Sequence, residues 1–234
     1  MSNELLLLGS VALVFGSLLV WLRLFGPDSL AGYSVFATLA GNIEVLILIE
    51  AFGMEQTLGN VMFASTFLIT DILSETRSKA AATRAVNIGL AASVTFILVS
   101  QSWLLFTPSA ADTMQPAIRQ IFSNTPRLML SSLGVYAVCQ HLDVFLYHRI
   151  WDLTARLTGS RDKLLWLRNN GATLISQFIN SVLFNFAAFG GSYPTATVWS
   201  FALAGYLIYV FTSLLDTPFV YLGRKIVRKY FPEG

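Results

Sequence analysis

Residues 60–75 read NVMFASTFLITDILSE, and this stretch decides how the rest of the chain is interpreted. It is mostly apolar, yet an amide, Asn60, stands at one end and two carboxylates, Asp71 and Glu75, stand toward the other. Charged side chains inside a membrane helix are costly and usually functional. The stretch therefore predicts a membrane-spanning helix whose acids have a specific task.

The composition of the whole chain supports a membrane environment. Of the 234 residues, 55% are hydrophobic and only 12% are charged, and the mean hydropathy is +0.63. Soluble domains carry about 25% charged residues, so a chain with half that fraction cannot cover a water-facing surface of this size. We predict an all-α, polytopic membrane helix bundle, and the length allows about six to eight spans of roughly 20 residues.

Turn signals and charged connections divide the chain into about seven spans. Gly26-Pro27-Asp28 ends the first span, and Gly190 to Pro194 divides the uncharged run 169–215, whose 47 residues are too many for one helix in a bilayer. Six spans plus an interfacial first helix is the alternative. We expect residues 1–234 to form a single transmembrane domain, with spans at 5–22, 30–52, 58–74, 85–107, 127–147, 169–189 and 195–215.

The basic residues predict the orientation of these spans. With seven spans, thirteen of the 15 Lys and Arg residues fall on one side of the membrane, and only Arg119 and Arg127 fall on the other. The side richer in Lys and Arg is normally cytoplasmic. We therefore expect the N-terminus outside the cytoplasm and the C-terminus inside it.

A polar stripe runs along the 58–74 span. Asn60, Phe67 and Asp71 recur at helical spacing and share one face, and Glu75 continues that face one turn later. A face with an amide, a ring and an acid suits a polar ligand with a flat ring. In the alternative interpretation the acids reach the cytoplasmic surface and pair with Arg77, Lys79 or Arg84, and this applies most to Glu75.

Other spans carry polar residues where a lipid-facing helix would have none. Glu44 stands in the predicted 30–52 span and costs several kcal/mol there unless it is protonated or paired. In the 169–189 span, Asn170, Thr173, Gln177 and Asn180 form one stripe, which we interpret as a cavity wall rather than as helix-to-helix hydrogen bonding. Gln140 and Asp143 stand near the inner end of the 127–147 span.

Signatures of metal sites and of enzymes are missing from the sequence. Cys139, His141 and His148 do not have metal-ligand spacing, and the chain has no HExxH, GxSxG or phosphate-binding glycine motif. We predict no metal, no cofactor, no enzymatic activity and no nucleic-acid partner.

Several blocks of sequence resemble a known family in the same order. They are TFLITDILSE (66–75), CQHLDV (139–144), LWLRNN (165–170), SQFIN (176–180) and LDTP (215–218). In these blocks the chain is similar to the queuosine precursor transporter family, bacterial inner-membrane proteins of the vitamin uptake transporter group. The first block is the most specific. The likeness covers most of the chain from about residue 41 onward.

The resemblance implies a fold akin to the substrate-binding components of energy-coupling-factor vitamin transporters, and uptake of 7-deazaguanine bases such as preQ0, preQ1 or queuine. A carboxylate can accept the N1–H and the exocyclic amine of such a base together. Asp71 is our first candidate for this contact and Glu44 the second, while amides would read the other edges. The full predicted substrate-binding set is Glu44, Asn60, Phe67, Asp71, Gln140, Asp143, Asn170, Gln177 and Asn180.

The chain departs from the family pattern at two places. Thr76-Arg77 replaces the Tyr-Gly that often follows Ser-Glu, and Asn180 stands where relatives often have Asp. The second change removes a charge and puts proton coupling through Asn180 in doubt. Import of another vitamin or nucleobase, and a non-transporting assembly protein, are the alternative functions. The sequence leaves open the energy source, an energising ATPase partner and a homodimer.

Overall fold

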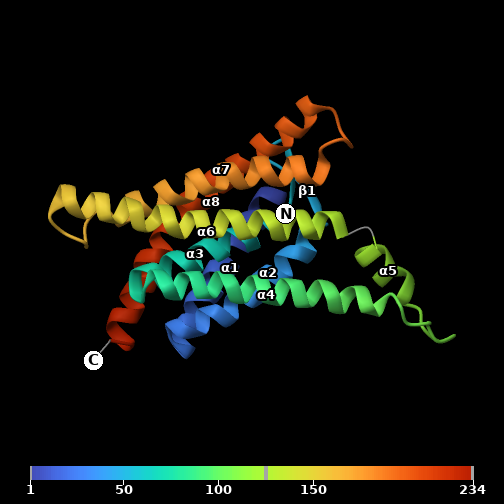
Figure 1. Ribbon diagram of the computed structural model, residues 1–234, viewed down its shortest axis with the longest axis horizontal. Coiled ribbons are helices and arrows are strands. Elements are labelled where there is room, and N and C mark those ends of the chain that lie inside the picture. Colours follow the sequence, from blue (N-terminus) through green and yellow to red (C-terminus); the bar gives the residue numbers. More distant parts are fainter. Residues whose placement is uncertain (1, 124–125, 233–234) are drawn as a thin grey trace.

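The computed structural model describes residues 2–123 and 126–232 and consists of a helical bundle with one small β-hairpin (Figure 1). The helices on the first half of the chain are α1 (Asn3–Phe25), the short 3-10 helix η1 (Pro27–Ser29), α2 (Leu30–Glu44), α3 (Gly59–Thr76) and α4 (Lys79–Trp103). The second half forms α5 (Gln115–Ser123), α6 (Pro126–Thr158), α7 (Leu165–Phe189) and α8 (Thr195–Tyr230). The strands β1 (Leu48–Ala51) and β2 (Met54–Thr57) lie between α2 and α3.

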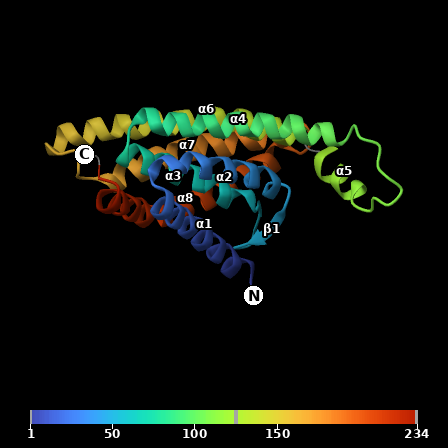
Figure 2. The same ribbon diagram turned by 90° about the horizontal axis from the view of Figure 1, so that it is seen from below.

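Helix α3 is the central element of the bundle. It packs against α1, α2, α4, α6 and α8, and fifteen of its 18 residues are buried. Figure 2 shows α4 and α6 side by side along one face of the bundle, with α1 on the opposite face. The stretch that predicted an unusual membrane helix therefore lies inside the protein, where its polar side chains can find protein partners.

A close backbone approach fixes α3 against α2. A Cβ atom on Gly59 would lie 2.9 Å from the carbonyl oxygen of Gly41 and 2.9 Å from the backbone nitrogen of Val45. Only glycine fits between these backbone atoms, so the two helices meet at the first residue of α3. At its other end, α3 turns into α4 through Ser78, whose side chain accepts a hydrogen bond from the Ala81 amide at 3.1 Å.

The structure corrects the predicted second span, 30–52. Helix α2 ends at Glu44, and residues 48–57 form an antiparallel hairpin with Ile49 opposite Gln56. Its two turn residues, Phe52 and Gly53, both have positive φ angles of 55° and 69°, as a two-residue hairpin turn requires. The apolar run was long enough for a helix, but this turn and the β-branched Ile47 and Ile49 favour strands.

The lengths of the helices agree with a membrane bundle. In the described part of the chain, α1, α4, α7 and α8 are long and apolar enough to cross a bilayer. Helices α6 and α8, with 33 and 36 residues, extend beyond the predicted spans, and α8 continues through Pro218. We call the end with the hairpin and the α7–α8 turn the hairpin end, and the end with the α3–α4 and α6–α7 turns the opposite end.

Candidate functional site

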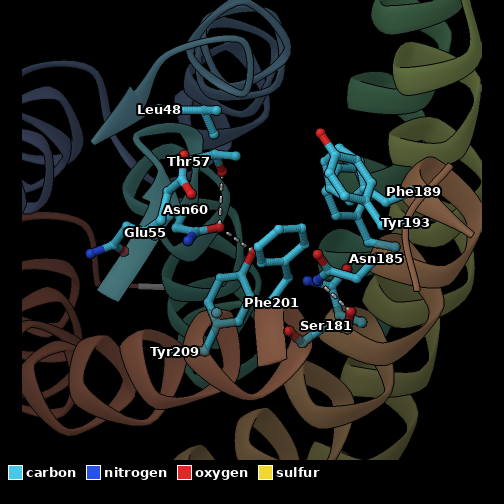
Figure 3. A pocket seen from close by; sticks show the side chains of 14 residues that line it. Leu48, Glu55, Thr57, Asn60, Ser181, Asn185, Phe189, Tyr193, Phe201 and Tyr209 are labelled. Atoms are coloured by element: carbon cyan, nitrogen blue, oxygen red, sulfur yellow. Dashed lines mark hydrogen bonds between the residues drawn. The ribbon is translucent and has the colours of Figure 1, made fainter. Parts of the chain in front are cut away.

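A pocket opens at the hairpin end between β2, the first turn of α3, α7 and α8 (Figure 3). It contains about 770 Å³ of space, including its opening to solvent. It is lined by Leu48, Glu55, Gln56, Thr57, Asn60, Asn180, Ser181, Phe184, Asn185, Phe189, Tyr193, Phe201, Gly205 and Tyr209. We call this cavity the hairpin pocket.

Gln56 is the least satisfied polar residue of the hairpin pocket. Its side chain is only 5% exposed, and neither its amide oxygen nor its amide nitrogen has a hydrogen-bond partner among the described residues. A buried amide without partners costs about 1–3 kcal/mol. The neighbouring Glu55 is exposed and also lines the pocket. Because successive side chains of a strand point to opposite faces, β2 presents the Glu55 carboxylate, and not the enclosed Gln56 amide, to the open cavity.

Other polar side chains of the hairpin pocket are already held in place. Asn60 accepts hydrogen bonds through Oδ1 from the Tyr209 hydroxyl at 3.0 Å and from the Thr57 hydroxyl at 3.4 Å, as drawn in Figure 3. Asn180 donates to Gln177 Oε1 at 2.9 Å, and Asn185 donates to the Ser181 carbonyl at 2.8 Å. These contacts orient the amides before a ligand arrives.

Aromatic rings form much of the remaining wall. Phe189, Tyr193 and Phe201 contact one another edge to face, with ring centroids 5.7–6.1 Å apart. A smaller cavity of about 410 Å³ continues inward from the hairpin pocket, shares Asn60, Asn180 and Tyr209 with it, and reaches Phe67 and Tyr136. Aromatic faces beside fixed amides suit a flat, polar heterocycle.

The predicted substrate-binding residues divide into three groups. Asn60 and Asn180 line the hairpin pocket, and Phe67 lines its inward extension. Glu44 is half-buried at the end of α2 and lines neither cavity. The remaining members, Asp71, Gln140, Asp143, Asn170 and Gln177, are buried between the helices outside both cavities.

Most members of this last group hydrogen-bond to neighbouring helices. Gln140 donates to the Thr66 hydroxyl at 2.5 Å, and Asp143 accepts from the Ser176 hydroxyl at 2.8 Å. Asn170 donates to the Thr217 hydroxyl at 2.8 Å, which joins α7 to α8. Asp71 differs from them, because neither of its carboxylate oxygens has a hydrogen-bond partner in the described part of the chain.

Glu75 forms an ion pair at the opposite end of the bundle with partners that the sequence did not indicate. Its carboxylate lies 2.5 Å from Arg168 Nε and 3.5 Å from Arg224 Nε, and it accepts from the Tyr147 hydroxyl at 2.8 Å. The sequence interpretation offered Arg77, Lys79 or Arg84 because they are near in the chain. Arg77 instead lies 3.7 Å from Asp28, and Arg84 is exposed on α4.

Sequence reasoning missed Gln56, Glu55 and Tyr209 as pocket residues. Residues 53–57 were interpreted as a short connection, so their side chains received no role. Gly53, which follows the β-branched Ile49, is the local turn signal in this stretch. Tyr209 gave no such signal, because one tyrosine in an apolar helix is usual.

The chain matches one protein family and one relative over most of its length. A family model described as "Putative vitamin uptake transporter" matches residues 57–223. The chain is also 38% identical over 210 residues to a protein of Bacillus subtilis (strain 168) named "Probable queuosine precursor transporter", with 89% of each chain covered. No solved structure matches the chain significantly. With its long apolar helices, the chain is a multi-pass membrane protein, and it belongs to the vitamin uptake transporter family.

Proposed function

We propose that this protein imports queuosine precursors, 7-deazaguanine bases such as preQ0, preQ1 or queuine, across the bacterial inner membrane. The observation that carries the proposal is the hairpin pocket, where the exposed Glu55 lines a cavity together with aromatic rings and oriented asparagines. The printed name of the Bacillus subtilis relative supports the same class of substrate.

The donors and acceptors of the pocket complement a guanine-like edge. Glu55 offers a carboxylate that can accept from N1–H and the exocyclic amine. The amides of Asn60 and Asn180 line the same pocket and can contact the O6 or N7 edge of such a base. Glu55 belongs to the hairpin, so β2 is the element that would read the donors of the base.

We propose again the substrate-binding set predicted from the sequence, with one change: the carboxylate that contacts the base is Glu55 instead of Asp71. Asn60, Phe67 and Asn180 are placed to contact a base in the hairpin pocket or its extension. Asp71 lies eleven residues after Asn60, about 16 Å along the helix axis, so we assign the carboxylate contact in this conformation to Glu55. Deeper along its path the substrate would meet Gln140, Asp143, Asn170 and Gln177. Substrate contact by Glu44 stays a prediction.

The proposed orientation puts the hairpin pocket on the periplasmic side. Seven helices, α1 to α4 and α6 to α8, would cross the membrane as one transporter domain, with the N-terminus periplasmic and the C-terminus cytoplasmic. The concentration of Lys and Arg at the opposite end supports this orientation. A homodimer and an energising ATPase partner stay predictions.

Equilibrium binding to the purified protein tests this function. We expect preQ0, preQ1 or queuine to bind and to raise the melting temperature, and adenine to do neither, because its edge presents an acceptor where Glu55 needs a donor. Glu55→Gln should weaken binding by about tenfold or more, since the lost pair of charge-assisted hydrogen bonds is worth roughly 1.5–3 kcal/mol.

Glu50→Gln is the matched control, because Glu50 is an exposed carboxylate on the neighbouring strand β1 and does not line the hairpin pocket. Equal affinities of the Glu55→Gln and Glu50→Gln proteins would remove Glu55 from the site. If no 7-deazaguanine bound the unmodified protein, the proposed substrate class would be wrong. Binding of a different vitamin would then reassign the pocket.

A further inference from the structure

Three aspartates from three helices lie in the interior of the bundle, beyond the hairpin pocket. Asp71 on α3, Asp143 on α6 and Asp216 on α8 are at most 2% exposed. Helix α3 packs against both α6 and α8, and Asp143 and Asp216 accept hydrogen bonds from Ser176 and Asn169, two turns apart on α7, so we treat the three as one group. We call it the aspartate cluster; none of its members lines the hairpin pocket or its extension.

The aspartate cluster has more hydrogen-bond acceptors than donors. Among the described residues, both oxygens of Asp71 and one oxygen of Asp143 lack a donor. The amide oxygens of Gln140 and Asn169 are buried without partners in the same way. The Asn169 amide nitrogen donates to Asp216 at 2.7 Å. These unpartnered oxygens call for a positively charged species.

The arginines near the aspartate cluster do not supply that charge. Within the described part of the chain, Arg168 and Arg224 pair with Glu75 rather than with any of the three aspartates. An ionised carboxylate buried without a partner costs several kcal/mol and is usually neutralised instead. A bound proton is the simplest neutraliser, because it also turns one acceptor into a donor. In the described residues no three acidic, Cys or His side chains are grouped closely enough to hold a metal ion.

We propose that Asp71 binds and releases the proton whose inward movement drives substrate uptake, with Asp143 and Asp216 as its electrostatic neighbours. This proposal rests on the transport function proposed above and adds its energy source. Asp71 is selected because Asp143 is stabilised by the Ser176 hydroxyl and Asp216 by Asn169, whereas Asp71 has no donor of its own from the described residues. Its charged form is thus the least supported of the three.

Helix α3 connects the proposed proton site with the substrate site. Asn60 lines the hairpin pocket on its first turn and Asp71 faces the aspartate cluster three turns later. A second connection runs along α7, where Asn180 in the pocket donates to the buried Gln177. The charged or titratable groups that surround Asp71 are Glu75 on α3, Asp143 and Tyr147 on α6, Arg168 on α7, and Asp216 and Arg224 on α8.

The test uses the whole protein in liposomes loaded with buffer and supplied with labelled preQ1 outside. With the outside more acidic, we expect accumulation of up to about tenfold per pH unit if one proton moves with each substrate. A protonophore should abolish accumulation. Asp71→Asn should abolish accumulation as well, yet keep exchange of labelled for unlabelled preQ1, because exchange needs no net proton movement. Asp71→Glu should keep pH-driven accumulation.

Asp152→Asn is the matched control, since Asp152 is an exposed aspartate on α6 that pairs with Arg161, and it should accumulate substrate normally. Proton-driven accumulation by Asp71→Asn would overturn the proposal, and so would uptake by the unmodified protein that follows a sodium gradient but not a proton gradient. If Asp71→Asn lost both exchange and binding of preQ1, Asp71 would be a substrate-contacting residue, and the proton-coupling proposal would again be overturned. Failure of the unmodified protein to bind or exchange any 7-deazaguanine would instead refute the proposed function.

Discussion

The Glu75 carboxylate is held by groups from three other helices. Arg168 on α7, Tyr147 on α6 and Arg224 on α8 all reach it, and the side chains of Glu75 and Arg168 are both 0% exposed. A buried ion pair adds little net stability when both partners are present, but removing one partner leaves an uncompensated charge. This network closes the opposite end of the bundle beneath the aspartate cluster.

We predict that Glu75→Gln lowers the free energy of unfolding by about 3–5 kcal/mol, because Arg168 is then buried without its counter-charge. Thermal or denaturant unfolding in detergent measures this loss. Asp152→Asn removes an exposed pair with Arg161 and should cost at most about 1 kcal/mol. Similar losses for the two variants would show that the Glu75 network does not stabilise the bundle.

At the scale of elements, the hairpin decides the shape of the substrate pocket. Its turn holds Gly53 at a φ of 69°, and a Cβ atom there would meet no atom within 4 Å. Gly9 in α1 also has free space around its Cβ position, but its backbone is helical. Replacing each by alanine therefore separates backbone strain from steric clash.

Gly53→Ala should destabilise the hairpin by about 1–2 kcal/mol, because an alanine is strained at positive φ. Since β2 carries Glu55, we also expect weaker binding of 7-deazaguanines, measured by calorimetry on the purified protein. Gly9→Ala should leave affinity unchanged and stabilise α1 slightly. Unchanged affinity in Gly53→Ala would mean that the hairpin does not position the reading groups.

The helices, strands and turns show which parts of the fold can be predicted from the sequence. The Gly-Pro-Asp turn after α1 and the break at 190–194 were located correctly because turn residues act locally. The hairpin was missed because an apolar run of helix length has no periodicity that excludes strands. The pairing of Glu75 with Arg168, 93 residues away, depends on helix packing that no local pattern encodes.

At the scale of the whole molecule, the orientation in the membrane is the main open prediction. Cys139 is buried and is the only cysteine of the chain, so Cys139→Ala gives a background for single-cysteine labelling. In this background we expect a membrane-impermeant maleimide to label Ser2→Cys and Ser109→Cys in intact cells. Ser160→Cys should be labelled only after the membrane is opened.

Labelling at these positions also distinguishes a topology of seven membrane spans from one of six. With six spans and an interfacial first helix, Ser2→Cys could lie on the same side as Ser160→Cys, and the two would then react alike. Labelling of Ser160→Cys in intact cells would reverse the proposed orientation. Because Ser109 and Ser160 flank α6 in the chain, they should report opposite sides in either case.

The short helix α2 has a consequence for the bilayer around it. Its 15 residues extend about 22 Å, whereas the hydrocarbon core is about 30 Å thick. The hairpin that follows has two strands, and their outer edges carry backbone groups that cannot face lipid tails. Headgroups and water must therefore descend toward Glu44 on this side of the protein. The transporter would thin its own membrane locally, and bilayer thickness would become one of the variables that set the rate of uptake.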